Sequence, residues 1–368
     1  MTTVDVYAII TGGGTGGHVT PALAIADELV ALGHARSSIR FVGAARGLEA
    51  TAVPAAGYEI ELLALDGIQR SLAPRDIVRS VRAVLKFMGA FIACLRALGE
   101  LRPAVVVGVG GYASAPAVLA ARVRRIPTLI HEQNAVPGLV NRIAVRAGAQ
   151  PLVAFPVPRW PRATVTGNPV RREIAEVARR PVAPPRVSVV GGSQGAGRLN
   201  DVALGLYDCW RAREDVSVRH VAGPKHVGAC RDRLATLRRA EDRLVYELVD
   251  FEPNMAELYA SSSLLLARAG ATTIAEAGAV GIAAVFVPWS GAAQDQQTAN
   301  VRTVAELGGA LVVSDADCDV AHVEPMLSEL LADPDRLAAM GAAARTGGHP
   351  GAASALGRII EGAARVAA

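Results

Sequence analysis

Short apolar runs alternate with Ala- and Leu-rich stretches along the first 150 residues of the chain. The short runs predict strands, and the stretches with apolar positions three or four residues apart predict helices. The strands are expected at residues 4–11, 39–42, 104–109 and 128–131, and the helices at residues 21–32, 74–98 and 116–123. Strands that alternate with helices are typical of an open parallel sheet, so the pattern predicts an α/β fold.

The same rhythm restarts in the second half of the chain. Strands are expected at residues 186–190, 220–222, 245–249, 264–267, 284–287 and 310–313, followed by a helical tail from Pro325. Between the halves, residues 151–185 contain eight prolines, which favours a linker or a stiff crossing segment. We therefore expect two doubly wound Rossmann-like domains, residues 1–165 and 166–349, with a C-terminal helix at 350–368 that can complete the first.

Each half opens with a strand, a glycine-rich loop and a helix. The loops read Gly12-Gly13-Gly14-Thr15-Gly16-Gly17-His18 and Gly191-Gly192-Ser193-Gln194-Gly195-Ala196-Gly197. Glycines let the backbone approach a ligand closely, and the N-terminus of the following helix favours negative charge. Two such loops, in domains that face each other across a cleft, suit an enzyme with two phosphate-bearing substrates. The alternative is that each loop is only a tight turn.

The first loop also matches the dinucleotide-binding fingerprint, with Gly12, Gly14 and Gly17 at the required spacing. That fingerprint needs an acidic residue about 20 positions later to hold the ribose. Residues 37–48 contain no acid, which weighs against an NAD enzyme, although Arg46 leaves an NADP-dependent oxidoreductase open.

Three polar groups after predicted strands are candidates for chemistry. His18 can act as a general base if the helix end keeps it neutral, or it can pack locally. Glu276 can accept two hydrogen bonds from a ribose diol, or serve only as an acid near a helix start. The third group is a set of neutral amide side chains, which can bind sugar hydroxyls or can simply begin a helix capped by Asp295. The further polar residues at strand ends are Gln296, Gln297, Asn300 and the run His131-Glu132-Gln133-Asn134.

Composition excludes several classes of protein. Apolar residues make up 51% of the chain, so it can bury real cores, and the four distant cysteines form no CxxC zinc motif. Asp315, Asp317 and Asp319 imitate a calcium loop, but Val320 and Met326 stand where that loop needs Gly and Glu, so an acidic turn is expected and no metal site. We also expect no signal peptide.

Charge is unevenly distributed. Residues 68–146 contain 12 Lys and Arg against three acids, whereas the whole chain carries a net charge of +4. Arg75, Arg79, Arg82 and Lys86 follow one face of the helix at 74–98, and Arg122, Arg124 and Arg125 form a second cluster. This favours an anionic membrane surface as partner, since aromatic residues that would stack on single-stranded nucleic acid are scarce. An ordinary helix with a solvated basic face is the alternative.

The opposite face of that helix is apolar. The apolar stripe on this face comprises Ile77, Val81, Val84, Leu85 and Met88. We expect it to pack on the sheet, and contact with a membrane is the second possibility.

In these motifs the sequence closely resembles the MurG family of bacterial glycosyltransferases. The matching segments are GGGTGGHVTPALAIA, GVGGYASAPAVLAA, HEQNAVPGLVNR, TGNPVR, GGSQGAGRLN, RAGATTIAE and QDQQTAN, in order from residue 12 to 300. The resemblance implies a GT-B fold and inverting transfer of N-acetylglucosamine from UDP-GlcNAc to the C4 hydroxyl of undecaprenyl-pyrophosphoryl-MurNAc-pentapeptide (lipid I), a step of peptidoglycan synthesis. It implies no cofactor and no required metal.

The resemblance also implies roles for individual residues. His18 would be catalytic. UDP-GlcNAc would be bound by Thr15, Gly16, Gly17, Asn134, Arg171, Ser193, Ala271, Thr272, Thr273, Ile274, Ala275, Glu276, Gln296 and Gln297. The acceptor would be bound by Gly13, Gly14, Gly110, Gly111 and Tyr112. The segment Glu252-Pro253-Asn254-Met255 departs from the apolar-Asp-Asp-Met that is usual in the family at the expected uracil contact, and Ala115 and Val301 replace a common Gly and Ala.

The family further implies a peripheral protein on the cytoplasmic side of the cell membrane, with other cell-wall synthesis proteins as possible partners. Two alternatives stay open besides the oxidoreductase. One is a GT-B enzyme for another UDP-sugar, and the other is a non-catalytic sensor of nucleotide sugars.

Overall fold

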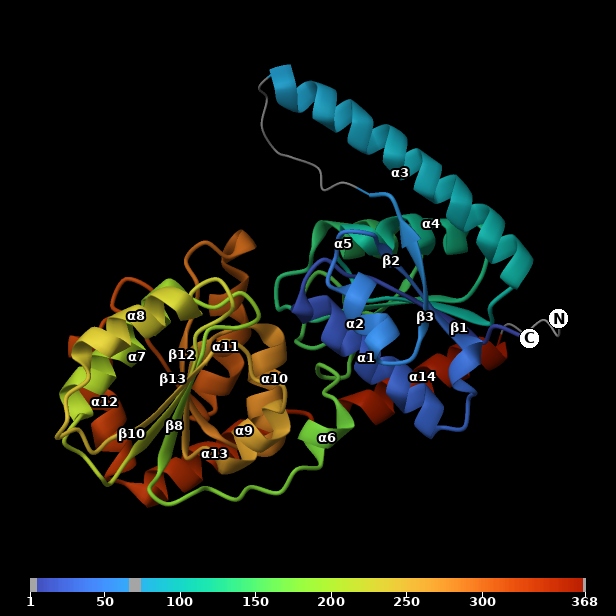
Figure 1. Cartoon of the computed structure of the whole chain (residues 1–368). Helices are drawn as coiled ribbons and strands as arrows, with labels where there is room; N and C mark the ends of the chain where they lie inside the picture. The colour runs from blue at the N-terminus through green and yellow to red at the C-terminus, as the bar shows by residue number, and fades with distance from the viewer. Residues whose placement is uncertain (1–4, 66–73, 367–368) are drawn as a thin grey trace. The chain divides into compact units, whose positions relative to one another are not determined.

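Two compact units, each built on its own parallel sheet, make up the chain in a computed structural model (Figure 1). The structure describes residues 5–65 and 74–366, with the side chains of 74–81 excepted. Unit 1 comprises the described residues up to Arg171 together with those from Gly351, and unit 2 comprises Arg172–Pro350. The expected α/β class and the two Rossmann-like domains are confirmed.

Sheet A of unit 1 has the strand order β3-β2-β1-β4-β5-β6-β7, and all its pairs are parallel. Its strands are β1 (Ala8–Thr11), β2 (Ile39–Ala44), β3 (Glu59–Leu63), β4 (Val105–Gly108), β5 (Thr128–Glu132), β6 (Gln150–Val153) and β7 (Thr164–Val165). Ile9 and Ile10 belong to different buried clusters, because successive side chains of a strand point to opposite faces. Both faces of the sheet are therefore covered.

Helices lie on both sides of sheet A. They are α1 (Gly16–Ala31), α2 (Glu49–Ala55), α3 (Pro74–Leu101), α4 (Ala115–Val123), α5 (Leu139–Arg146) and the C-terminal α14 (Ala352–Val366), with short 3-10 turns η1 (Arg36–Ser38) and η2 (Tyr112–Ser114). Leu356 and Ile360 of α14 are buried in one cluster with Ile25 and Leu29 of α1, so the end of the chain completes the core of unit 1.

Sheet B of unit 2 has the order β10-β9-β8-β11-β12-β13 and is also parallel throughout. Its strands are β8 (Arg186–Val190), β9 (Ser217–Val221), β10 (Val245–Val249), β11 (Leu264–Arg268), β12 (Ala283–Val287) and β13 (Ala310–Val312). Its helices are α6 (Arg172–Ala175), α7 (Gly197–Trp210), α8 (Val227–Leu237), α9 (Met255–Ser261), α10 (Ala271–Val280), η3 (Ala293–Asp295), α11 (Gln296–Glu306), α12 (Val320–Leu331) and α13 (Pro334–Gly347).

Two expectations about local structure are wrong. The linker or crossing segment expected at residues 151–185 begins instead inside sheet A, which β6 and β7 extend to residue 165. β7 pairs only with Leu152 and Val153, so the missing N–H of Pro151 breaks no bond on that side. The first helix begins at Gly16 rather than at Pro21. Pro21 therefore lies inside the helix, in its second turn.

The apolar stripe of α3 does not pack on sheet A as expected. Val84, Leu85 and Met88 are exposed, whereas Ala90, Cys94 and Leu98 are buried against the sheet. Figure 1 shows why: only the C-terminal half of α3 lies over the sheet, and the rest extends beyond it. Arg75, Arg79, Ile77 and Val81 lie outside the described side chains.

Candidate active site

The first glycine loop lies at the topological switch point of sheet A. β1 leads to β2 on one side, while β4 pairs with β1 on the other, so the loops after β1 and β4 diverge at the carboxyl edge. Open α/β sheets bind ligands at this point. A side chain on Gly12 would come within 2.9 Å of the Gly110 carbonyl oxygen, and one on Gly111 within 2.4 Å of the Gly13 carbonyl oxygen. The glycines are required because the two loops touch.

His18 lies in the first turn of α1, directly after this loop. Its Nδ1 is 3.3 Å from Thr15 Oγ1. A methyl group on Gly110 would lie 3.2 Å from both His18 Nε2 and Asn141 Nδ2, so the imidazole faces the loop after β4. A proton on Nδ1 that is donated to Thr15 leaves Nε2 as an acceptor on that side. The expected catalytic histidine and the expected acceptor-binding glycines therefore lie together.

The environment of His18 keeps the imidazole neutral. Desolvation lowers its pKa, and the charges of Glu132 and Glu49 oppose that shift without cancelling it. A neutral imidazole near pH 7 is the form that can accept a proton. The electrostatics of the site thus permit general-base chemistry.

Glu132, at the end of β5, organises the next loop. Its buried carboxylate accepts hydrogen bonds from Asn134 N at 3.0 Å, Gly138 N at 2.9 Å and Asn141 Nδ2 at 2.8 Å. Beside it, desolvation lowers the pKa of His131 to about 4 while Nε2 lies 3.0 Å from the Gly167 carbonyl oxygen. The polar run that the sequence singled out is therefore largely occupied in holding the loop that carries Asn134.

Several buried polar atoms at this edge make no hydrogen bond in the structure. They include Thr11 Oγ1, Gln133 Oε1, Asn141 Oδ1 and both amide atoms of Asn168. Buried polar groups without a partner are rare and are typical of sites that receive a ligand or water. Asn141 and Asn168 were not among the expected site residues, although both stand in the motifs HEQNAVPGLVNR and TGNPVR.

The second glycine loop occupies the switch point of sheet B. β8 leads to β9 on one side and pairs with β11 on the other, so the loops that precede α7 and α10 diverge there. Neither α7 nor α10 begins with a side-chain cap, which leaves backbone N–H groups at both helix starts. Ser193 is exposed in the first of these loops, and Thr272 Oγ1 is buried without a partner in the first turn of α10. Two helix N-termini at one edge suit a diphosphate.

Glu276 and Gln297 stand on helices that begin at the same edge. The Tyr259 hydroxyl donates to Glu276 Oε2 at 2.9 Å, which fixes a carboxylate that is buried within α10. Gln297 Oε1 accepts from Trp289 N at 2.8 Å, while Gln296 is the first residue of α11. Thr15, Gly16, Gly17, Asn134 and Arg171 belong to unit 1, and the other expected donor residues belong to unit 2.

An ion pair that the sequence did not reveal joins three loops of sheet B. Arg268 Nη1 lies 2.7 Å from Asp315 Oδ1, and each side chain is only 11% exposed. Burial would raise the pKa of Asp315, but hydrogen bonds from Ser290 and Arg268 hold it below its usual value. Asp315 was assigned only to an acidic turn; its carboxylate in fact ties the end of β11 to the loops after β12 and β13.

A chain of hydrogen bonds between uncharged side chains, here called the neutral relay, supports the second glycine loop. The Tyr246 hydroxyl lies 2.9 Å from His220 Nδ1, His220 Nε2 lies 2.9 Å from Asn200 Oδ1, and Asn200 Nδ2 donates to the Ala222 carbonyl oxygen at 3.1 Å. Burial lowers the pKa of His220 to about 4, so the relay is uncharged. The Ala222 oxygen is also the atom that a side chain on Gly195 would meet at 2.2 Å.

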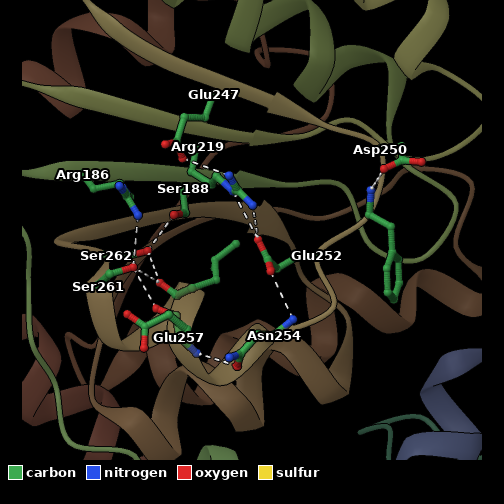
Figure 2. A network of polar contacts seen from close by, with 12 residues as sticks. Arg186, Ser188, Arg219, Glu247, Asp250, Glu252, Asn254, Glu257, Ser261 and Ser262 are labelled. Carbon is green, nitrogen blue, oxygen red and sulfur yellow. Dashed lines mark hydrogen bonds and ion pairs between the residues drawn. The ribbon is translucent and has the colours of Figure 1, made fainter.

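The loop after β10, where the sequence departs from the family pattern, is held by Glu252. Figure 2 shows Arg219 between Glu247 and Glu252. Arg219 Nη2 donates to Glu252 Oε2 at 2.7 Å. Glu252 Oε1 accepts from Asn254 N at 3.1 Å, and Asn254 Oδ1 in turn accepts from Glu257 N at the start of α9. The loop is thus anchored on both sides of Pro253.

Within the described residues, no group of three or more His, Cys, Asp and Glu side chains is placed to hold a metal ion.

Two family models match this chain. The model of the glycosyltransferase family 28 N-terminal domain matches residues 8–150, and that of the glycosyltransferase family 28 C-terminal domain matches residues 186–356. The chain belongs to glycosyltransferase family 28. The first model covers strands β1 to β5 of sheet A, the second covers all of sheet B, and each includes one glycine loop.

Curated members of this family match along nearly the whole chain. A protein of Anaeromyxobacter dehalogenans (strain 2CP-C) is 37% identical over 95% of this chain and 91% of its own length. A protein of Frankia casuarinae is 38% identical over 97% of this chain and 95% of its own. Both are named UDP-N-acetylglucosamine–N-acetylmuramyl-(pentapeptide) pyrophosphoryl-undecaprenol N-acetylglucosamine transferase. The resemblance to the MurG family is confirmed.

Solved structures agree with this assignment. Acinetobacter baumannii MurG superposes with a TM-score of 0.78 at 29% identity, over 97% of this chain and 99% of that one. A UDP-N-acetylglucosamine 2-epimerase, at 15% identity and a TM-score of 0.62, shares the fold alone. The fold by itself therefore does not separate a transferase from an epimerase, and the family match does.

Proposed function

We propose that the protein transfers N-acetylglucosamine from UDP-GlcNAc to lipid I and forms lipid II. The proposal rests on two different switch-point sites in one family 28 chain. Sheet A has a neutral histidine at its site, and sheet B has two uncapped helix N-termini. The first is suited to activating a hydroxyl, and the second is suited to holding a diphosphate.

The chemistry assigns one role to each site. His18 takes the proton from the C4 hydroxyl of the acceptor as that oxygen attacks the anomeric carbon of the donor. The bond from that carbon to UDP breaks on the opposite face, through an oxocarbenium-like transition state, so the configuration inverts. The N–H groups at the starts of α7 and α10 stabilise the charge that grows on the diphosphate.

Release of UDP in the presence of UDP-GlcNAc and a short-chain lipid I analogue tests the proposal. We expect UDP release to depend on the acceptor and to yield a product with one added N-acetylhexosamine. An epimerase would convert UDP-GlcNAc without acceptor, a different UDP-sugar would be preferred by another GT-B enzyme, and a nucleotide-sugar sensor would bind without turnover. Any of these three results would contradict the proposal.

Unit 1 also carries a surface suited to a lipid-borne acceptor. Val84, Leu85 and Ile92 of α3 are exposed, as is Val123 at the end of α4. A shallow apolar pocket between these two helices is lined by Phe87, Met88, Phe91, Leu119, Arg122, Val123 and Ala147. Exposed basic side chains stand beside it, among them Arg82, Lys86, Arg124 and Arg125. Apolar side chains framed by basic ones match an anionic bilayer surface.

Within the described residues, no helix is both long and apolar enough to cross a bilayer. The membrane part of the proposal is therefore peripheral attachment, on the cytoplasmic face, by α3 and α4.

Vesicle co-sedimentation tests this attachment. Binding should rise with the fraction of anionic lipid and fall with added salt, because each basic residue near the surface contributes about 1 kcal/mol. The double variant Arg82→Gln with Lys86→Gln should bind about 30-fold more weakly, on the same principle. The matched control, Arg231→Gln with Arg239→Gln, removes two exposed charges from unit 2 and should change nothing. Equal binding of the wild type to neutral and anionic vesicles would contradict this proposal.

A further inference from the structure

Glu49 is a buried carboxylate that the proposed reaction does not use. It is the first residue of α2 and is 1% exposed. Its Oε2 accepts a hydrogen bond from Gly14 N at 2.8 Å, and its Oε1 accepts one from Ala44 N at 2.9 Å. One side chain thus connects the glycine loop after β1 with the end of the neighbouring strand β2.

Three glycines make room for this carboxylate. A side chain on Gly13 would lie 2.1 Å from Glu49 Oε1, one on Gly47 2.0 Å from Oε2, and one on Gly43 2.6 Å from Cγ. Real Cβ atoms do not approach other atoms so closely. The glycines of the loop, of β2 and of the turn before α2 therefore form a cradle that fits a glutamate, and two backbone N–H groups point into it.

We propose that Glu49 is a positioning residue for sugar transfer: its carboxylate holds the backbone at Gly14 and so fixes Thr15 and His18, which follow directly at the start of α1. The loop contains four further glycines, and glycine gives the backbone more freedom than any other residue. Without an anchor, such a loop would sample many conformations. The hydrogen bond to Gly14 N selects one of them, in which the imidazole faces the loop after β4.

The charge of Glu49 has a second consequence for the same histidine. Two carboxylates raise the pKa of His18 against the larger effect of desolvation: Glu132 from the end of β5 and Glu49 from α2. Removal of the Glu49 charge should lower the pKa of His18. Since His18 must be neutral to act as base, the acidic limb of the pH–rate profile should then move to lower pH. A residue that served only stability would not move that limb.

The experiment compares three variants of the full-length protein with one control. Glu49→Gln keeps the shape but replaces one acceptor oxygen by an NH2 group that opposes an N–H. Glu49→Asp keeps the charge but withdraws it by one methylene. Gly13→Ala leaves Glu49 in the chain and pushes a methyl group against its carboxylate. Glu61→Gln, which neutralises an exposed carboxylate on the nearby strand β3, is the control.

Hydrogen exchange of the backbone N–H groups at residues 12–17 measures the anchor itself. We expect exchange to be at least about tenfold faster in Glu49→Gln, Glu49→Asp and Gly13→Ala, with no change in Glu61→Gln, since an amide without its acceptor opens more easily. This readout needs neither substrate. Unchanged exchange at Gly14 in Glu49→Gln would overturn the inference whatever the enzyme does.

The second readout is kcat together with the affinity for UDP, and its interpretation rests on the proposed function. All three variants should lose about 10- to 100-fold in kcat, with UDP affinity within threefold of the wild type, because misplacement of a catalytic group costs rate. The acidic limb should shift only in Glu49→Gln. If kcat of that variant stays within threefold, the inference fails while the proposed function stands. If the wild type itself shows no acceptor-dependent turnover, the proposed function fails, and hydrogen exchange still decides on the anchor. If Glu49→Gln does not fold, Gly13→Ala carries the same comparison.

Discussion

The two glycine loops begin alike and are held in place differently. In the first, the N–H of Gly14 is taken by the carboxylate of Glu49. In the second, no carboxylate in the described part of the chain accepts from the backbone of residues 191–197, and the support comes from the neutral relay of Tyr246, His220 and Asn200. The N–H of Gly14 is therefore not available to an anion, whereas no carboxylate of the described residues competes for the N–H groups of the second loop.

The difference indicates a division of labour. Sheet A combines acids with a histidine whose pKa lies below its usual value, which suits proton transfer. Sheet B places two uncapped helix starts beside each other, which suits the diphosphate of the donor. A contact of the acceptor with Gly14 would not use the N–H of that residue, because the Glu49 carboxylate already accepts from it.

The largest expected effect is on kcat, and it concerns the histidine at sheet A. His18→Ala should lower kcat by about 10²–10⁴-fold, the usual contribution of a general base, with UDP affinity nearly unchanged. His322→Ala, which removes an exposed histidine from α12, is the matched control and should leave both quantities as they are. Steady-state kinetics with the lipid I analogue measures the effect. A kcat within threefold of the wild type would mean that another group takes the proton.

A smaller effect is expected on the side of sheet B. Glu276→Ala removes a buried carboxylate that is positioned by Tyr259 and that we expect to accept from the donor ribose. Affinity for UDP-GlcNAc should fall at least about tenfold, since a hydrogen bond to a charged group contributes about 1.5–3 kcal/mol. Calorimetric titration measures it, with the exposed Glu306→Ala on α11 as control. Unchanged donor affinity in a folded Glu276→Ala protein would remove Glu276 from the site.

The last prediction concerns stability rather than activity, and it tests a feature that the two sheets share. Each buries one neutral histidine, and burial lowers the pKa of His131 and of His220 to about 4. In the unfolded chain both protonate near pH 6.5, so the unfolded state binds more protons between these values. Stability should therefore be full above about pH 6.5 and fall toward pH 4, by about 3 kcal/mol per histidine at most.

Denaturant unfolding at pH 7 and pH 5 measures this loss. His220→Phe should flatten the pH dependence of unfolding for unit 2, even if the variant is less stable at pH 7 because Asn200 loses a partner. A pH dependence equal to that of the wild type would show that His220 does not carry it.

Local pattern predicted most of the strands and both switch-point loops, because these depend on neighbouring residues, but strands β3, β6 and β7 were not expected. Arg186–Val190 and Val245–Val249 are found as expected, and both glycine loops precede helices. The contacts between distant residues were not predictable. Glu49 reaches Gly14 across 35 positions, and Arg268 reaches Asp315 across 47. The only local sign of Glu49 is an acid beside Gly43 and Gly47, which composition alone does not distinguish from a surface helix start.

The errors also have physical causes. Periodicity placed an apolar stripe on α3 correctly but could not tell that the helix extends beyond the sheet, so Val84 and Leu85 were assigned to the core. Proline density favoured a linker or a crossing segment at residues 151–185, whereas the start of that segment belongs to strands β6 and β7 of sheet A. In both cases the outcome depended on the size of the sheet, which no short segment encodes.

The division of labour is tested most directly by calorimetric titration of UDP-GlcNAc into His18→Ala and Glu276→Ala side by side. If the two sheets divide their roles in this way, His18→Ala should bind UDP-GlcNAc about as tightly as the wild type. Glu276→Ala should bind it at least about tenfold more weakly, in line with the charged hydrogen bonds removed. Equal losses in the two variants, or a loss confined to His18→Ala, would contradict the division of labour.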